Sequence, residues 1–468
     1  MADPLAESPL PAGVIAAGRE LVPISPALGT AAWYGDIDLQ LELPRAWDVV
    51  VHWPATPAPL RDSDLEACLA QPIGQPRLGE LAKGRRDACI IVDDLTRPTP
   101  AAAILRHVTA ELAAAGLEDS AISIVIGSGT HGPAKLGIDA KIGAEAAARF
   151  RVIQHDDRRH CVRVGTTSFG SPVEANRAVV EADLVVGIGG IYPQHTVGFG
   201  GGAKIVLGVL GRHSIERLHY RHPSVEGRLD VQSDFRRDVA EMARRLGLMI
   251  SINALVDARR RLVWVGAGDP EQCFSAGRQL AATWFAAPPP GDADVVIANA
   301  YPMDLSATFV RSKGVVPLTW AAPHASRILI GAASEGLGHH GLFPLESDRT
   351  QRLRHALRRV RNTRREELPG LVGRRVASVA RRTMSRRPAP TGVDRGPILF
   401  HPTRPRHDLP ATLGGMRVVP EWRDVVALVE ERQRPVGESR SAGAALRAVV
   451  YPCSSLQVLA EVVRSEAG

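Results

Sequence analysis

The residue types best suited to chemistry gather in one glycine-rich run, GIGGIYPQHTVGFGGGAKI, at residues 187–205. The run holds seven glycines, the polar pair Gln194 and His195, and a terminal Lys204. Glycines at this density let backbone amides approach a ligand closely, and a helix that starts after them would direct its first amides at an anion. The run therefore predicts an anion-binding site.

Lys204 is unusual because only five of the 57 basic residues are lysines. Where arginine supplies most cations, a retained primary amine suggests chemistry that a guanidinium cannot perform. The lysine could also bind a phosphate, but GFGGGAK lacks the GK[ST] ending of a P-loop, so nucleoside triphosphate hydrolysis is poorly supported.

Two further polar motifs each follow an apolar run. After residues 88–92, Arg97 could bind a carboxylate with Asp94 orienting it, and a cap on the next helix explains the aspartate equally well. His131 lies between glycines in the loop 127–133, where a general acid or base would be accessible and where a solvated histidine is also common.

Five other histidine and aspartate side chains have weaker claims. His155 and Asp156 could form an oriented pair, although surface polarity explains them as well. His213, His219 and His222 crowd one segment, which suggests one metal ligand more readily than two. The residues alone predict an enzyme acting on a small anion.

The elements that must position these residues alternate between strands and helices. Strands are predicted at 88–92, 122–126, 150–153 and 182–186, with helices up to about 115 and at 141–149. This rhythm predicts a doubly wound, largely parallel sheet whose ligands lie beyond the carboxyl ends of the strands. Each polar motif lies at such an end.

A second α/β unit is predicted after the proline-rich linker 286–291. Its strands are expected at 295–298, 327–330, 397–400 and 448–451, with helices through Lys313 and near 421–431. We therefore expect an N-terminal domain at 1–285 and a C-terminal domain at 286–468, with the active site in the cleft between them. Residues 1–85 are proline-rich, with strand-like pieces at 37–41 and 47–51 and a helix near 62–70.

Charge and composition exclude several classes of protein. The net charge of +7 comes from an arginine-rich segment at about 350–388, in which residues 353–360 have helical apolar spacing, and the rest of the chain is slightly acidic. This charge distribution argues against nucleic-acid binding as its role. No apolar run reaches the roughly 20 residues needed to cross a bilayer, no signal peptide is evident, and five scattered cysteines favour reduced thiols. These features predict a cytoplasmic protein that does not associate with membranes.

The motifs together resemble those of the nickel-pincer-dependent lactate racemases and their 2-hydroxyacid racemase and epimerase relatives. The resemblance runs from about residue 87 to 345 and is most specific over 170–211. Its carriers are DDLTRPTP (93–100), GSGTHGP (127–133), the glycine-rich run, SIERLH (214–219), NAYPMD (299–304) and SEGLGHHGLF (334–343).

The resemblance implies a cofactor and a set of roles. Lys204 would carry nickel bound in a pyridinium-3,5-bisthiocarboxylic acid mononucleotide, His219 would be the protein ligand to nickel, and the cofactor-biosynthesis enzymes would be partners. The remaining roles would be cofactor contacts from Thr96, Gly198, Gly200, Gly201 and Gly202, proton transfer by His131, and substrate binding by Asp94, Arg97 and Lys313.

The chain departs from the family pattern where a second catalytic histidine is expected. The family's Glu-Pro-His is replaced by Tyr192-Pro193-Gln194, and His195 follows one place later. Glutamine cannot exchange a proton near neutral pH, so His195, Gln194 in an altered role, or another group must act there. Near Lys313 the family's Tyr-Gln is replaced by Phe309-Val310, which argues against lactate as substrate.

The expected function is therefore racemisation or epimerisation of a small 2-hydroxyacid other than lactate, by reversible hydride transfer. One alternative is a non-catalytic member that binds a nucleotide-like anion. The other is a hydrolase or lyase that uses His131 and Asp94.

Overall fold

The computed structural model describes residues 27–194, 196–222, 232–342, 396–402, 409–433 and 445–460, with the single residues 345 and 357. The described residues form two compact units. The larger comprises 55–286 and 337–342, and the smaller comprises 27–54, 287–336 and the described residues of 396–459. The arginine-rich segment and its expected helix lie outside the described residues, apart from the exposed Leu357.

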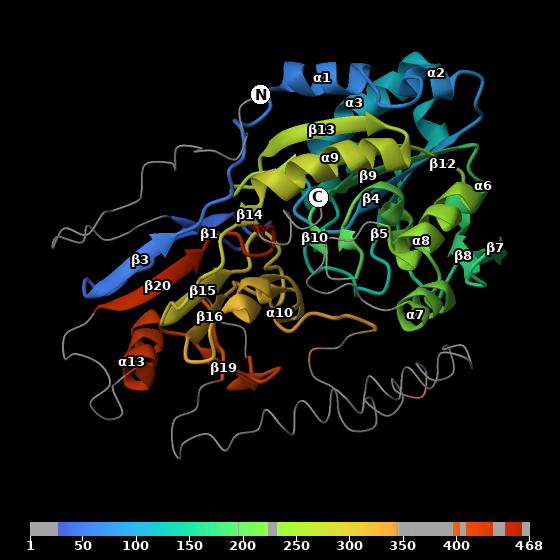
Figure 1. Cartoon of the computed structure of the whole chain (residues 1–468). Helices are drawn as coiled ribbons and strands as arrows, with labels where there is room; N and C mark the ends of the chain where they lie inside the picture. The colour runs from blue at the N-terminus through green and yellow to red at the C-terminus, as the bar shows by residue number, and fades with distance from the viewer. Residues whose placement is uncertain are drawn as a thin grey trace. The chain divides into compact units, whose positions relative to one another are not determined.

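The larger unit is built on a six-stranded sheet in the order β13-β12-β9-β4-β5-β6 (Figure 1). Its strands are β4 (Ala88–Asp93), β5 (Ile122–Gly127), β6 (Arg151–Gln154), β9 (Leu184–Gly190), β12 (Leu248–Val256) and β13 (Leu262–Gly268). All neighbours are parallel except β12 and β13. This confirms the predicted α/β class with largely parallel strands.

Helices and short hairpin-like strands complete this unit. Its helices are α1 (Asp62–Ala70), α2 (Leu78–Ala82), α3 (Ala101–Ala114), α4 (Asp139–Ile142), α5 (Ala144–Arg149), α6 (Arg177–Glu181), α7 (Arg212–Arg221), α8 (Asp234–Arg245) and α9 (Pro270–Trp284), with 3-10 helices η1 (Asp119–Ala121) and η2 (Gly202–Val209). Two small antiparallel pairs join β7 (Cys161–Thr166) to β8 (Pro172–Asn176) and β10 (Pro193–Gln194) to β11 (Gly198–Phe199). The single helix predicted at 141–149 is interrupted because Gly143 adopts a positive φ of 85°.

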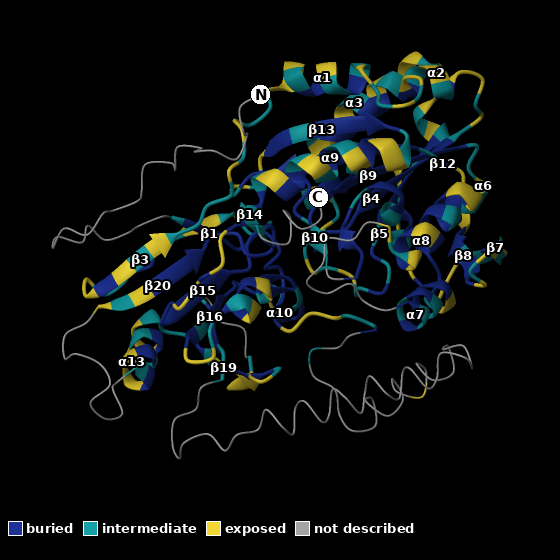
Figure 2. Ribbon diagram, viewed as in Figure 1, coloured by how far each residue is buried: buried dark blue, intermediate teal, exposed yellow. Residues whose placement is uncertain are grey.

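The central strands are buried throughout, whereas the outer helices alternate buried and exposed positions (Figure 2). One face of the sheet presents Ile91, Val125 and Val185 to an apolar cluster that also contains Val206 of η2 and Phe235 of α8. Burial on both faces explains why the strands read as continuous apolar runs in the sequence.

The strand order places a topological switch point between β4 and β9. The chain proceeds outward from β4 to β5 and β6 on one side, and β9 lies on the other side. In open parallel sheets, ligands bind beyond the carboxyl ends of the strands at such a point. The fold therefore directs Asp93 and Asp94 after β4, and the glycine-rich loop after β9, to one place.

The smaller unit has a seven-stranded sheet in the order β18-β19-β17-β16-β15-β20-β3. Its elements are β1 (Leu28–Thr30), β2 (Ile37–Leu39), β3 (Trp47–Val51), β15 (Val295–Asn299), α10 (Ala307–Gly314), η3 (Val316–Trp320), β16 (Ser326–Ile330), β17 (Ile398–Phe400), β18 (Thr412–Leu413), β19 (Met416–Val419), α13 (Trp422–Gln433), β20 (Leu446–Tyr451) and β21 (Val458–Leu459). Each strand predicted in this half of the chain is present. The short β14 (Ala286–Ala287) spans the point where the two units divide.

The two units differ from the expected domains at the N-terminus. Residues 27–54 belong with the C-terminal unit, because β3 pairs in parallel with β20 over five residues. Sequence order placed them in the N-terminal domain, but strand pairing between distant segments cannot be read from a linear pattern. The expected boundary near residue 286 lies beside the observed division.

Candidate active site

One cavity in the larger unit brings together most of the side chains expected to act. Its empty volume, including space open to solvent, is about 810 Å³. It is lined by the ends of β4, β5 and β9, the glycine-rich loop, η2 and α7. The functional side chains on its wall are Asp93, Asp94, Arg97, His131, Tyr192, Gln194, Lys204, His219, Asn253 and His340.

His131 is held by Asp94. The imidazole Nδ1 lies 2.8 Å from Asp94 Oδ2, and the other carboxylate oxygen accepts hydrogen bonds from the hydroxyl and amide of Thr96 at 2.5 and 3.2 Å. A carboxylate only accepts, so Nδ1 carries the proton and Nε2 of the neutral ring carries the basic lone pair. This arrangement is that of a general base with an orienting carboxylate.

The Asp94 carboxyl remains ionised. Its burial alone would raise its pKa, but His131 and Arg97 nearby and the hydrogen bonds that it accepts lower the pKa to about 2. The carboxylate is therefore charged at any pH where the protein would work, and it can stabilise a protonated His131.

Replacing Asp94 by asparagine should remove the carboxylate that orients His131 and stabilises its protonated form. For the activity that the sequence resemblance implies, we expect Asp94→Asn to lower the rate of Cα hydrogen exchange at least about 100-fold, because an amide can stabilise the wrong tautomer of His131 and cannot stabilise its cation. The exchange rate is measured by mass spectrometry of a Cα-deuterated 2-hydroxyacid. Asp156→Asn, at an exposed aspartate beside another histidine, is the matched control, and equal rates for both variants would contradict this role.

Arg97 lies over an aromatic ring. Its guanidinium carbon is 5.2 Å from the centroid of the Tyr192 ring, which permits a cation–π contact. Burial raises the pKa of the Tyr192 phenol to about 12, so this side chain stays neutral. The tyrosine thus supports the arginine and is a poor base.

The glycine-rich loop is clamped from behind by polar side chains. Gly201 and Gly202 have positive φ values of 98° and 60°, which side chains rarely adopt. The Gly202 amide donates to Asn253 Oδ1 at 2.7 Å, and buried Arg236 donates to the carbonyls of Phe199 and Gly201 at 3.2 Å each. These contacts fix the backbone that presents Lys204.

Lys204 lines the cavity, and the pKa of its amine is far below the usual lysine value. Among the described residues, its Nζ makes no hydrogen bond and no ion pair. Burial, with added repulsion from Arg97 and Arg236, lowers its pKa to about 7. Near neutral pH a large share of the side chain is therefore the uncharged, nucleophilic amine.

This pKa predicts how Lys204 reacts with an acylating reagent. The ammonium form is inert, so the rate of acetylation should rise between about pH 6 and 8 and level off above the midpoint near 7. In the urea-unfolded chain, the rate of acetylation of the same lysine should still be rising near pH 10, because the usual pKa of a lysine is about 10.4. Peptide mapping after brief acetic anhydride treatment measures both curves, and coincident curves would contradict the shift.

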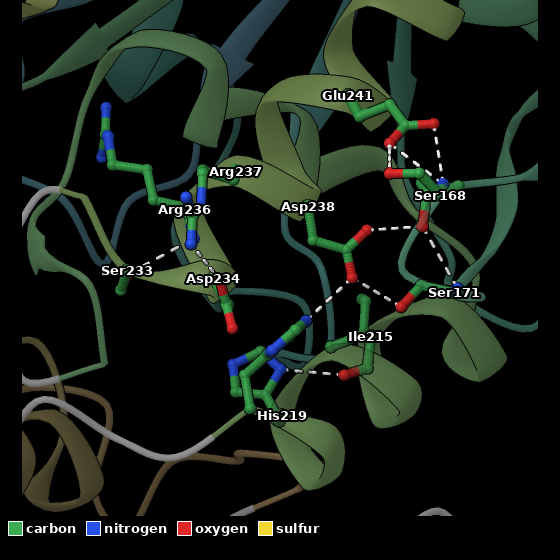
Figure 3. A network of polar contacts seen from close by, with 12 residues as sticks. Ser168, Ser171, Ile215, His219, Ser233, Asp234, Arg236, Arg237, Asp238 and Glu241 are labelled. Atoms are coloured by element: carbon green, nitrogen blue, oxygen red, sulfur yellow. Dashed lines mark hydrogen bonds and ion pairs between the residues drawn. The ribbon is translucent and has the colours of Figure 1, made fainter.

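His219 lies on α7 and lines the cavity. Its Nδ1 donates to the Ile215 carbonyl at 2.8 Å within the same helix (Figure 3), so the lone pair of the neutral ring is on Nε2. Burial lowers its pKa to about 4, which keeps the ring neutral, as a metal requires. The ring packs edge-on against Phe235 at 5.1 Å.

The neighbouring histidines serve other purposes. His222 Nε2 pairs with Asp238 Oδ2 at 2.9 Å, and this fully buried carboxylate also accepts a hydrogen bond from Thr167. It accepts another from Ser171 (Figure 3). His213 is exposed. His222 and His213 therefore have other surroundings, and the interpretation of a single metal ligand in this segment stays a prediction.

The possible dyad of His155 and Asp156 is not formed. His155 is buried and bonds to the Leu210 carbonyl and to Asn176, whereas Asp156 is exposed and faces Arg159. Adjacent residues on a chain leaving a strand point to opposite sides, so sequence adjacency did not give contact.

Beneath the cavity lies an ion pair that no sequence motif indicated. Lys141 Nζ is 2.6 Å from Asp93 Oδ1 and also donates to the Arg97 carbonyl at 3.1 Å. The other Asp93 oxygen accepts from Thr99 and from the Gly190 amide at 2.7 and 3.0 Å. This network ties the end of β4 to the end of β9, and the scarcity of lysines was the only available signal for it.

The other predicted site residues are distributed unevenly. Gln194 lines the cavity, but its amide oxygen accepts from the Thr196 amide at 2.5 Å within the loop. Of the four glycines assigned to the cofactor, Gly201 and Gly202 line the cavity, whereas Gly198 and Gly200 lie in or beside β11. Thr96 is bonded to Asp94.

Two predicted residues cannot be placed in this cavity. Lys313 is buried in α10 of the smaller unit, and His195 lies outside the described residues. Their roles stay predictions.

Three general features of the described residues bear on the sequence interpretation. None of the five cysteines, all of which lie in the described ranges, forms a disulfide bond. No helix in the described ranges is long and apolar enough to span a bilayer. In the same ranges, no three histidine, cysteine, aspartate or glutamate side chains are arranged to hold a metal ion.

Comparison with known proteins supplies the family. Residues 34–228 match the model of the lactate racemase N-terminal domain. The chain is 28% identical over 295 residues to the lactate racemase of Thermoanaerobacterium thermosaccharolyticum, a match covering 60% of this chain and 67% of the relative. It is 26% identical over 292 residues to the lactate racemase of Lactiplantibacillus plantarum, covering 60% and 68%.

A solved structure shares the fold. The lactate racemase apoprotein from T. thermosaccharolyticum superposes with a TM-score of 0.65 and 20% identity, covering 92% of this chain and 99% of that one. These similarities support a function of the racemase or epimerase type. With the motifs on the cavity wall, the matches show that residues 34–228 carry a lactate racemase N-terminal domain and that the chain is a divergent relative of the lactate racemases in sequence and fold.

Proposed function

We propose that the protein racemises or epimerises a small 2-hydroxyacid through a nickel-pincer nucleotide attached to Lys204. The observation that carries the proposal is that one cavity holds the Lys204 amine and the neutral His219 imidazole together with the His131–Asp94 pair. Attachment needs an uncharged amine, nickel needs a neutral imidazole, and hydroxyl oxidation needs a base.

The residues present fit this cofactor. The clamped glycine turn exposes backbone near Gly201 and Gly202 where a phosphate could bind, and His219 offers one nitrogen donor to a metal. The remaining donors would come from the nucleotide, since the described residues form no three-ligand cluster. When bound, the cofactor would accept a hydride from Cα and return it.

Side chains of the protein itself would transfer the hydroxyl proton and bind the substrate carboxylate. His131 Nε2 would take the hydroxyl proton as the hydride leaves, and Asp94 would stabilise the imidazolium that results. Arg97, stacked on Tyr192, would bind the substrate carboxylate bidentately. We propose that Lys313 also binds the substrate and that His195 or Gln194 contributes on the loop after β9.

The substrate is proposed to be a 2-hydroxyacid other than lactate. Phe309 and Val310 stand where the family pattern has Tyr-Gln, and both are buried in α10. They offer no polar side-chain contact to a carboxylate of lactate size. The enzymes that build the cofactor are the proposed partners, and the cytoplasm, where reduced cysteines persist, is the proposed location.

The test is co-expression with the cofactor-making enzymes, followed by metal analysis and intact mass. We expect about one nickel per chain and a mass increase that maps to the Lys204 peptide. Incubation with Cα-deuterated 2-hydroxyacids then tests for loss of deuterium and for inversion by chiral chromatography. Nickel-free, unmodified protein from this co-expression would reject the cofactor.

One alternative is a non-catalytic protein that binds a nucleotide-like anion, and the replacement of the family's histidine by Gln194 favours it. The same experiment separates the two proposals. Loaded protein that exchanges no Cα hydrogen with any 2-hydroxyacid tested would support the alternative.

A further inference from the structure

A second imidazole enters the cavity from a distant part of the chain. His340 lines the cavity wall, and its ring centroid is 5.0 Å from that of His131, with the planes inclined at 66°. The two residues also form an antiparallel β-bridge, and the Gly341 amide donates to the Thr130 carbonyl at 2.9 Å. Backbone contacts thus hold His340 beside the proposed base.

The tautomer of His340 is set by its own chain. Its Nδ1 accepts a hydrogen bond from the Leu342 amide at 3.3 Å. A ring nitrogen accepts only when it is unprotonated, so the neutral ring carries its proton on Nε2. His131 has the opposite tautomer, because its Nδ1 faces the Asp94 carboxylate. The cavity therefore holds one imidazole that accepts a proton at Nε2 and one that donates a hydrogen bond from Nε2.

We propose that His340 binds the oxygen on the reacting carbon of the substrate through its Nε2–H. The inference rests on the proposed function and deepens it. As the hydride leaves Cα, the hydroxyl proton passes to His131 Nε2, and the oxygen becomes a carbonyl that accepts the His340 hydrogen bond. On return of the hydride, His131 gives the same proton back, so protons and electrons balance and His340 never ionises.

This pairing accounts for the loss of the second histidine base. The group that exchanges a proton in this reaction is the oxygen, whereas the carbon exchanges a hydride. If two imidazoles hold the oxygen, the planar 2-oxoacid can release its carboxylate from Arg97, make a half-turn about the carbon–oxygen axis and present its other face to the hydride. One base then serves both enantiomers, and Gln194 need not exchange a proton.

The adjacent histidine provides a matched control. His339 is exposed, whereas His340 is partly buried on the cavity wall. His340→Leu removes the hydrogen-bond donor, whereas His340→Gln keeps an N–H at a similar distance from the backbone. His339→Leu makes the same substitution at the preceding residue. Circular dichroism and thermal unfolding establish that each variant folds.

The kinetic test uses the nickel-loaded protein and the 2-hydroxyacid that it exchanges. We expect His340→Leu to lower kcat about 10²–10³-fold, as the loss of one donor to a developing oxyanion does. His340→Gln should stay within about tenfold of the parent and keep its pH–rate profile, and His339→Leu should equal the parent. His340→Leu with kcat within threefold of the parent, or a glutamine variant as impaired as the leucine variant, would overturn the proposal.

A second measurement does not depend on the cofactor. In unloaded protein with ¹⁵N-labelled histidine, the His340 signal is assigned by its loss in His340→Gln. The expected ring has a protonated Nε2 and an unprotonated Nδ1, and the reverse tautomer would overturn the proposal. An inactive loaded parent would reject the proposed function, and this role with it, whereas an active parent with an unaffected leucine variant would reject this role alone.

Discussion

Replacing Lys204 by arginine is expected to abolish both the proposed covalent adduct and the proposed racemase activity. Arginine keeps the positive charge, but its guanidinium remains protonated at any working pH and offers no amine for a stable bond to the nucleotide. The native amine is suited to that bond because burial brings its pKa to about 7. The effect should be complete loss, since no other lysine lines the cavity formed by the described residues.

The measurement is intact mass and nickel content after co-expression with the cofactor-making enzymes, followed by the exchange assay. Lys83→Arg makes the same change at an exposed position outside the cavity and should leave the adduct, nickel and activity unchanged. Residual activity in Lys204→Arg above one thousandth of the parent rate would show that the nucleotide acts without this bond.

Replacing Lys141 by methionine is expected to destabilise the protein by about 3–5 kcal/mol. Only 1% of the lysine surface is exposed, and its partner Asp93 would be left as an uncompensated buried charge. Burial lowers the pKa of Lys141 while Asp93 opposes that shift, so the pair depends on its mutual contact. Because Lys141 also donates to the Arg97 carbonyl, the position of Arg97, the proposed substrate-binding arginine, should be disturbed as well.

Urea unfolding measures this effect, and two further variants define its origin. Lys141→Met combined with Asp93→Asn should recover part of the loss, because the buried carboxylate is then neutral. Arg149→Met, at a largely exposed arginine paired with Asp119, should change the free energy of unfolding by less than about 1 kcal/mol. A change below 1 kcal/mol for Lys141→Met would show that the ion pair is not structurally important.

Much of the fold could be predicted because local patterns carry it. The buried strands β4, β5 and β9 appear in the sequence as short apolar runs, and their alternation with helices indicates a parallel sheet. Strand pairing is different, since nothing local to Trp47–Val51 indicates that it joins β20 almost 400 residues later. That pairing depends on which edges remain open when the rest of the sheet has formed.

The same distinction holds in the cavity. Lys204, His131, Asp94, Arg97 and His219 could be proposed from the sequence, because each lies in a motif whose spacing resembles that of a known family. Lys141 could not, because it reaches the cavity from a segment without a distinctive motif of its own. His340 lies in the SEGLGHHGLF motif, but its place beside His131 could not be predicted, because that contact joins segments about 200 residues apart in the sequence.

The sequence by itself thus determined the α/β class, the family resemblance and the principal reactive groups. The tertiary structure decided which nitrogen of His131, His219 and His340 carries the proton. It also buries the Lys204 amine, and this burial lowers the pKa to about 7, so that much of the amine is uncharged near neutral pH. Tautomers and pKa values depend on burial and on partners that are distant in the chain, and only folding brings those partners together.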